Sequence, residues 1–138
     1  MDNATIVLVF GTFDGLHDGH RFFLREAQRY GEKLVVSVAT DEVVLELKKR
    51  APKQGLAERM AALMQSKLVD EAVAGDTVRG NWSVIKNHRP AVVAVGHDQN
   101  TLEEKLREFI QRENLPIAIV KINALEPDRL HSRFLLKK

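Results

Sequence analysis

The sequence of 138 residues contains no cysteine. Disulfide bonds and thiolate metal sites are therefore excluded, and secretion is disfavoured. Long apolar runs are also missing, because no stretch approaches the ~20 consecutive apolar residues that span a bilayer, and we expect no membrane segment. The opening residues, MDNATIVLVF, have no basic region before their apolar run and no small-residue cleavage site after it. They do not resemble a secretion signal, so we expect a cytoplasmic protein.

An excess of charge of either sign is missing as well. Lys and Arg number 21 against 19 Asp and Glu, which leaves a net charge of only +2. Two short basic clusters stand out, Lys48-Lys49-Arg50 and Lys137-Lys138. Because nucleic-acid-binding domains carry a basic excess or an extended basic face, we expect no nucleic-acid partner.

What the sequence does contain is an alternation of short apolar runs with amphipathic segments of helical period. The runs are rich in β-branched residues and apolar on both faces, as buried parallel strands are. This order predicts an α/β fold, a doubly wound, Rossmann-like parallel sheet in the strand order 3-2-1-4-5 with helices on both faces. We expect residues 1–138 to form a single domain. The five predicted strands are Ile6–Phe10, Leu34–Ala39, Glu71–Ala74, Ala91–Val95 and Ile117–Ile122.

The amphipathic segments predict helices that bury one face each against this sheet. We expect Trp82 and Ile85 to belong to the core rather than to a base-stacking surface. The loop Arg50–Gly55, which contains Pro52, is expected to be the most mobile part of the chain. The apolar positions of the segments are Phe22, Phe23, Ala27 and Tyr30, then Val43, Val44 and Leu47, then Met60, Leu63 and Met64, then Trp82 and Ile85, and last Leu102, Leu106, Phe109 and Ile110.

Two polar turns follow the predicted first and fourth strands. GTFDGLHDGH occupies residues 11–20, and GHDQ occupies residues 96–99. In a sheet of order 3-2-1-4-5, strands one and four are neighbours at the point where the strand order reverses. Ligands of such sheets bind beyond the carboxyl ends of the strands at that point. We therefore expect the two turns to face each other across one crevice.

The first turn has residues suited to a phosphate. Gly11 and Gly15 permit positive φ and a close backbone approach, and Gly19 leaves the start of the next helix bare, with free N–H groups. His17 and His20, three residues apart, can lie on one face and add two ring donors.

Other interpretations of these residues stay open at this point. The glycines are also typical of a tight strand-to-helix turn, and the histidines of exposed helix-start residues or a zinc pair. A zinc pair would lack a visible third ligand. The glycine spacing matches neither the dinucleotide fingerprint nor the P-loop, so both of those classes are excluded.

The stretch GTFDGLHDGH resembles the G-T-F-D-x-x-H-x-G-H signature of the cytidylyltransferase-like nucleotidyltransferases. The resemblance continues in TDEVVLELKKR, in LAERMAALMQSKLVDEAVAG and in GHDQ, and so covers nearly the whole chain. Within the family, GHDQNTLEEKLREF and LHSRFLLKK resemble archaeal-type FAD synthases, which transfer AMP from ATP to FMN. Glycerol-3-phosphate cytidylyltransferases, which use CTP, come next. The seven signature positions are Gly11, Thr12, Phe13, Asp14, His17, Gly19 and His20.

The resemblance implies in-line attack by an acceptor phosphate on the α-phosphorus of a nucleoside triphosphate, with loss of pyrophosphate. It implies a divalent metal such as Mg²⁺ on the phosphates but no metal ligand from the protein. His17 and His20 are implied at the α-phosphate and leaving oxygen, and Lys48 or Lys49 at the acceptor phosphate, with help from Arg59. The nucleotide-binding residues that it implies are Gly11, Thr12, Phe13, Asp14, Gly19, Gly96 and Asp98, among which Asp14 braces the turn and Asp98 faces the nucleotide.

Two of these implied roles have a plain alternative. Lys48-Lys49-Arg50 is also typical of a solvated helix end, and Arg59 of an exposed helix residue.

The carboxyl-terminal part departs from the family pattern. Relatives carry a helix start of the type S-T-T or H-S-S that holds the outer phosphates, whereas this chain has His131-Ser132-Arg133. Ser132 can cap the helix, and Arg133 can neutralise a phosphate. The substitution is also compatible with an inactive member.

Three functions therefore remain: an ATP:FMN adenylyltransferase, a glycerol-3-phosphate cytidylyltransferase, and a nucleotide- or flavin-binding protein without turnover. The implied partners are a nucleoside triphosphate, a phosphate-bearing acceptor and, because dimers are common in the family, a second copy of the chain.

Overall fold

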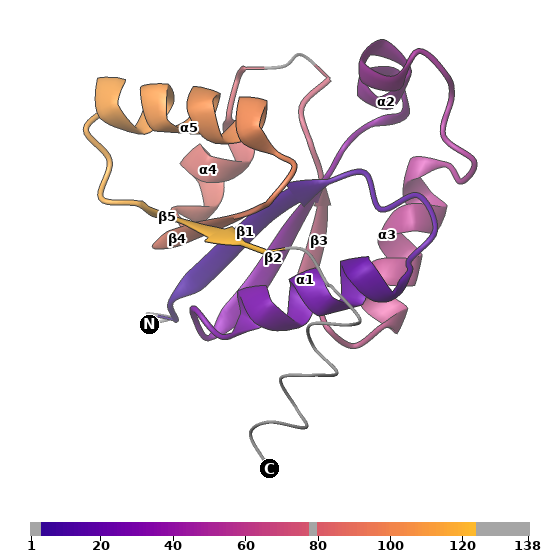
Figure 1. The fold of residues 1–138 in the computed structure, drawn as a ribbon, viewed down its shortest axis with the longest axis horizontal. Helices are drawn as coiled ribbons and strands as arrows, with labels where there is room; N and C mark the ends of the chain where they lie inside the picture. Colours follow the sequence, from indigo (N-terminus) through magenta and orange to yellow (C-terminus); the bar gives the residue numbers. More distant parts are fainter. Residues whose placement is uncertain (1–3, 78–79, 124–138) are drawn as a thin grey trace.

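The fold is built on a parallel sheet of five strands (Figure 1). The computed structural model describes residues 4–77 and 80–123. The strands follow the order β3-β2-β1-β4-β5, and all neighbouring pairs are parallel, which confirms the predicted fold class. Each strand begins and ends within one residue of its predicted position. The bounds are Ile6–Gly11 for β1, Lys33–Val38 for β2, Glu71–Ala74 for β3, Val92–Gly96 for β4 and Ala118–Ile122 for β5.

Helices cover both faces of this sheet. α1 and α3 pack on one face and α4 and α5 on the other, while α2 stands at the carboxyl end of the strands (Figure 1). Val7 and Val9 of β1 belong to the core under α1 and α3, whereas Leu8 belongs to the core under α4 and α5. Because consecutive strand residues point to opposite faces, both faces of β1 are buried. The helices are α1 Asp18–Gln28, α2 Asp41–Lys48, α3 Leu56–Gln65, α4 Ser83–His88 and α5 Asn100–Arg112.

Three side chains that the helical period assigns to the core are exposed instead. The solvent-exposed fraction is 45% for Tyr30, 52% for Leu47 and 44% for Met64. Tyr30 lies beyond the end of α1, so the helix period no longer sets its direction. Met64 lies one position, or about 100° of rotation, past the buried Leu63. Leu47 is in phase with buried residues of α2, but α2 extends past the sheet and leaves it uncovered.

Among the described residues, no helix combines the length and the apolarity needed to cross a bilayer. Ser132 and Arg133, predicted to contact the outer phosphates, lie outside the described residues.

Candidate active site

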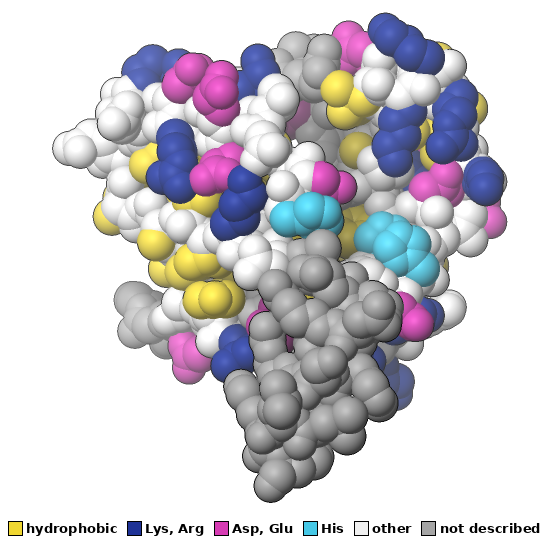
Figure 2. Space-filling view, in the orientation of Figure 1, with side chains coloured by type: hydrophobic (Ala, Val, Ile, Leu, Met, Phe, Trp, Pro, Cys, Tyr) yellow, Lys and Arg dark blue, Asp and Glu magenta, His cyan; other side chains and the backbone are white. Residues whose placement is uncertain are grey.

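A crevice of about 1210 Å³ opens at the carboxyl ends of the strands. Its walls include the turn that follows β1 and the turn that follows β4, as the strand order predicts. Histidine side chains gather near the middle of this face of the molecule, with apolar side chains visible between them (Figure 2). Ten of the predicted site residues line this crevice, while Lys49 and Arg59 do not: Gly11, Thr12, Phe13, Asp14, His17, Gly19, His20, Lys48, Gly96 and Asp98.

We divide the residues that line the crevice into two parts, according to the strand that they belong to or follow, because β1 lies between β2 and β4 in the sheet. We call the two parts the β2–β3 half and the β4–β5 half. The β2–β3 half is lined by Ser37, Ala39, Val43, Leu47, Lys48, Arg50, Lys53, Gly75, Asp76, Gly80, Trp82 and Val84. The β4–β5 half is lined by Gly96, His97, Asp98, Gln99, Thr101, Leu102, Lys105, Ile122 and Asn123.

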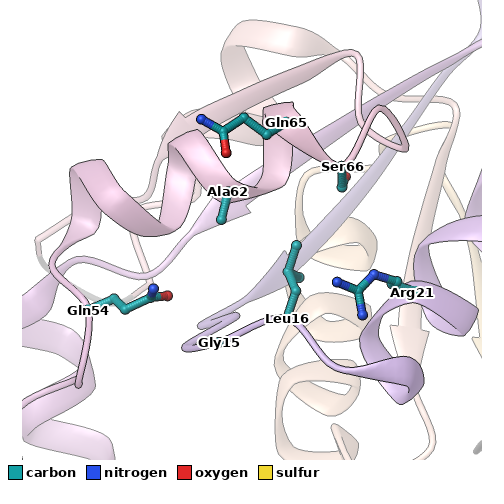
Figure 3. A pocket seen from close by; sticks show the side chains of 7 residues that line it. All are labelled: Gly15, Leu16, Arg21, Gln54, Ala62, Gln65 and Ser66. Carbon is teal, nitrogen blue, oxygen red and sulfur yellow. The ribbon is translucent and has the colours of Figure 1, made fainter.

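A smaller hollow of about 340 Å³ lies between the first turn, the start of α1 and α3 (Figure 3). The side chains of Arg21 and Gln54 reach toward Leu16 from opposite sides of it. None of the predicted catalytic residues lines this hollow. The predicted catalytic residues therefore point to the larger crevice as the candidate site.

His17 and His20 cap the start of α1 with their side chains. Nδ1 of His17 accepts a hydrogen bond from the His20 N–H at 3.3 Å, and Nδ1 of His20 accepts one from the His17 N–H at 3.4 Å. This reciprocal arrangement is a capping box. Because each Nδ1 accepts a backbone proton, the neutral rings carry their own proton on Nε2. The Nε2–H of His17 therefore remains for a ligand of the crevice, whereas the His20 ring also has a hydrogen bond with the Gly15 backbone.

The two imidazole rings also stack on each other. Their centroids are 3.6 Å apart with planes 17° from parallel, and the edge of Phe13 packs on His20. Burial is the largest cause that lowers the pKa of His20 below its ordinary value of 6.5. The charges of His17, Lys48 and Arg21 lower the pKa further, while a hydrogen bond with the Gly15 backbone opposes them. His20 is therefore neutral at pH 7 in the free protein, and an approaching polyphosphate would raise its pKa again.

The glycines of the turn are required for different reasons. A Cβ on Gly11 would lie 2.5 Å from the Phe13 ring, and a Cβ on Gly19 would lie 3.0 Å from the His17 ring. Gly15 has a φ of +85°, which a side chain disfavours. Gly15 thus uses the positive φ that a glycine permits, whereas Gly11 does not and instead allows the close approach of Phe13. Phe13 itself takes the left-handed conformation, with φ 52°.

Asp14 fastens the first turn to the loop that precedes α3. Its carboxylate accepts hydrogen bonds from the N–H groups of Lys53 at 2.7 Å and Gln54 at 2.8 Å. These two bonds hold the pKa of Asp14 below its ordinary value. Asp14 thus braces the turn, as expected, and it also restrains the second half of the loop for which the sequence predicts the greatest mobility.

Arg59 is fully buried, and its interpretation as an exposed helix residue is wrong. Its Nη1 donates to the Thr12 carbonyl at 2.9 Å, its Nε to the Gln54 carbonyl at 2.9 Å, and its Nη2 to the Asp41 carboxylate at 2.7 Å. Arg59 does not line the crevice. Rather than helping Lys48 at a substrate, it joins the first turn, the loop before α3 and the start of α2.

The basic cluster at the end of α2 is split between solvent and crevice. Lys48 is the last residue of α2, and Lys49 ends the helix with a left-handed φ of 61°. Lys48 and Arg50 line the crevice together with Lys53, whereas Lys49 does not. The geometry therefore favours Lys48 over Lys49 as the residue that faces a ligand.

Two residues of the crevice wall have contacts that the sequence did not indicate. Trp82 packs on Phe10 and Phe109 in the core under α4 and α5, as predicted, but it also lines the crevice. Gln99 joins the ends of β1 and β4 through its side chain. The GHDQ turn was the only sequence signal for Gln99, and it carries no indication of this contact.

The described residues contain no cluster of three or more acidic, His or Cys side chains that could hold a metal ion alone. Three carboxylates line the crevice, but those of Asp14 and Asp76 accept backbone hydrogen bonds. The exposed Asp98 is the remaining one. Because Mg²⁺ is often held by one or two carboxylates together with substrate phosphates, this donor set fits a metal that arrives with a nucleotide.

Known proteins resemble this chain over most of its length. The cytidylyltransferase-like family matches residues 8–133. An FAD synthase from Thermococcus sibiricus is 37% identical over 116 residues, which cover 84% of this chain and 78% of that protein. An FAD synthase from Methanoregula boonei is 37% identical over 138 residues, which cover 98% of this chain and 90% of that protein.

A solved structure shares the fold over most of the chain. The lipopolysaccharide core biosynthesis protein from Thermoplasma volcanium superposes with a TM-score of 0.80 at 29% identity, covering 90% of this chain and 100% of that one. The sheet order, the intact signature at the carboxyl end of β1 and these similarities agree with one another. The chain therefore belongs to the cytidylyltransferase-like family of nucleotidyltransferases.

Proposed function

We propose that this protein transfers AMP from ATP to FMN, forming FAD and pyrophosphate. The observation that carries the proposal is that one crevice is lined by all seven signature residues, including both histidines, whose rings lie together at the start of α1. The relatives named FAD synthase support FMN as the acceptor.

In the proposed reaction, a phosphate oxygen of FMN attacks the α-phosphorus of ATP. As the new P–O bond forms, the bond to the oxygen that bridges the α- and β-phosphates breaks, and pyrophosphate leaves with the electron pair. Negative charge develops on that oxygen and on the α-phosphoryl group. The Nε2–H groups of His17 and His20 would donate to these oxygens, and most of the acceleration would come from positioning and charge stabilisation.

The β2–β3 half has the features that an FMN acceptor needs. Lys48, Arg50 and Lys53 supply positive charge for the phosphate, and Val43 and Leu47 supply an apolar wall beside them. FMN joins a dianionic phosphate to a flat, largely apolar ring, so it requires both. Glycerol 3-phosphate would use the cations and leave the apolar wall exposed to water.

The β4–β5 half would then receive the ATP. A divalent ion bound to the triphosphate would neutralise part of its charge, and Asp98 is the residue that would contact such an ion. The divalent metal, the cytoplasmic location and the homodimer stay predictions.

A matrix of nucleotides and acceptors tests this function. Purified protein is given ATP or CTP with FMN or glycerol 3-phosphate, and pyrophosphate release and product formation are measured. We expect FAD from ATP and FMN and much slower turnover in the other combinations. Product formation from CTP and glycerol 3-phosphate would show instead that the protein is a glycerol-3-phosphate cytidylyltransferase. If no combination releases pyrophosphate, a nucleotide- or flavin-binding protein without turnover is favoured.

A matched pair of variants links the activity to the crevice. His20→Ala removes a ring that lines the crevice, whereas His88→Ala removes one that does not line it and that contacts Glu71 and the Val84 carbonyl. We expect FAD formation to fall only in His20→Ala. Equal rates in the two variants would contradict the assignment.

A further inference from the structure

Gln99 bridges the ends of the two central strands. Its Oε1 accepts a hydrogen bond from the N–H of Gly96, the last residue of β4, at 2.8 Å. Its Nε2 donates to the Phe10 carbonyl, near the end of β1, at 3.0 Å. The paired register of β1 and β4 stops at Val9 and Ala94. The carboxamide thus links the two strands beyond the last pair, with its donor toward one strand and its acceptor toward the other, as a peptide group would be.

The bond to the Phe10 carbonyl is the first of three consecutive anchors on the signature turn. The Gly11 carbonyl accepts from the Ala39 N–H, just past β2, at 2.9 Å, and the Thr12 carbonyl accepts from Arg59. Because the peptide bonds are trans, fixing a carbonyl also fixes the direction of the N–H group on the other side of the same peptide. Three peptides in a row are therefore oriented from three different parts of the fold, and Gln99 is the anchor from the β4–β5 half.

We propose that Gln99 is a positioning residue that sets the distance between the signature turn and the β4–β5 half of the crevice. The inference rests on the function proposed above, in which one ATP molecule contacts both the histidines and that half. The distance between the two then decides how the α-phosphorus is aligned with the attacking oxygen. A misplacement of about 1 Å is enough to cost roughly a hundredfold in rate.

Among substitutions at this position, Glu gives a reversible test. Ionised Glu can accept from the Gly96 N–H but cannot donate to the Phe10 carbonyl, whereas protonated Glu has one O–H donor and one acceptor oxygen, as Gln99 does. The activity of Gln99→Glu should therefore recover as the pH falls. Gln99→Met keeps a similar volume but loses both hydrogen bonds at every pH.

The experiment measures kcat and KM of FAD formation from pH 5.5 to pH 8. The kcat of each variant is divided by the kcat of the wild-type protein at the same pH. At pH 8 we expect kcat to fall about tenfold to a hundredfold in both variants, with the KM for FMN changed by less than about threefold. For Gln99→Glu the ratio to wild type should rise at least about fivefold toward pH 5.5, and for Gln99→Met it should stay flat.

Gln111→Glu is the matched control, because Gln111 lies exposed on the same helix, α5, and outside the crevice. Its ratio to wild type should stay near one at every pH. Division by wild type also removes the titration that both proteins share. The charged and titratable groups that line the crevice near position 99 are His97 and Asp98 on its own turn, Lys105 on α5, and His17, His20 and Asp14 on the signature turn. Glu103, whose N–H donates to the Gln99 carbonyl, also lies nearby with its ion-pair partners Arg107 and Lys121.

A flat ratio for Gln99→Glu, or wild-type kcat in Gln99→Met, would overturn the inference. Thermal melting of each variant is measured first, and if neither Gln99 variant folds, the role is architectural and the inference also fails. If the wild-type protein binds ATP but makes no FAD, the proposed function fails by itself. In that case the dissociation constant for ATP is measured over the same pH range for each variant and divided by the wild-type value. The pH dependence of this ratio then decides whether Gln99 positions the turn.

Discussion

Replacing Arg59 by Met should destabilise the protein by about 3 kcal/mol. The guanidinium is fully buried, and it donates to the carbonyls of Thr12 and Gln54 and to the carboxylate of Asp41. Met fills most of the volume but donates to none of them. Each carbonyl left without its donor costs about 1–3 kcal/mol. The Asp41 side chain is 51% exposed, so its carboxylate regains water and adds little to the cost.

The assay is thermal unfolding, followed by the rate of FAD formation. For a domain of this size, about 3 kcal/mol corresponds to a fall in Tm of roughly 12 °C. Well below the new Tm, kcat should still be reduced, because the Thr12 carbonyl belongs to the signature turn and has lost its anchor. Arg59→Lys keeps the charge but cannot fork to three acceptors, so we expect an intermediate loss.

Arg25→Met is the control, because Arg25 is exposed on α1. Its Tm should stay within about 2 °C of wild type, as for surface substitutions in general. If Arg59→Met also melts within about 2 °C of wild type, the three hydrogen bonds contribute nothing net and the reasoning is refuted. If it melts lower but keeps the wild-type kcat, Arg59 stabilises the fold without positioning the turn.

Four further changes test other parts of the site. His17→Ala or His20→Ala should lower turnover at least about a hundredfold, while the free energy of unfolding falls only by the ~1 kcal/mol of a helix cap. Pyrophosphate release at the wild-type rate would exclude the two histidines from the mechanism. The pKa of Asp14 is lower in the folded protein than its ordinary value of 3.8, so the ionised carboxylate stabilises the fold. This stabilisation is complete above pH 3.8 and is lost as the pH falls through the lower pKa of the folded state. Unfolding free energies of Asp14→Asn and wild type should therefore differ at pH 7 and converge in acid, and a constant difference would refute this. Lys48→Met should raise the KM for FMN about tenfold with little change in the KM for ATP, and the reverse pattern would place Lys48 at the nucleotide. Arg133→Ser, outside the described residues, should raise the KM for ATP and weaken its salt dependence, and tighter binding would contradict a phosphate-binding cation.

The sequence was sufficient for the sheet because parallel strands buried on both faces leave a local signal. Runs such as Ile6–Gly11 are apolar at successive positions, and no helix on the surface of a domain needs that pattern. Helix faces were predicted less well. Leu47 shares the period of its buried neighbours, yet it is exposed because α2 projects past the sheet. The period gives the direction of a side chain but not the presence of a layer to cover it.

Arg59 shows how a strong general expectation can hide a local signal. It lies three residues after Leu56 and four before the fully buried Leu63, so the helical period places it on the buried face of α3. The expectation that an arginine is exposed outweighed that period. Its three acceptors come from positions 12, 41 and 54, far apart in the sequence, and nothing local indicates that they converge.

Gln99 could not be found from spacing, because its role depends on where β1 and β4 cease to pair. Gln99 donates to the Phe10 carbonyl and Arg59 to the Thr12 carbonyl, two residues further along the chain. The two donors come from elements on opposite sides of β1. Arg59 connects that turn to the β2–β3 half through the loop before α3, and Gln99 connects it to the β4–β5 half. If a nucleotide occupies one half and an acceptor the other, the signature turn lies between them with its backbone anchored to both. The histidines that follow are then aligned by the two bordering halves as well as by their own helix.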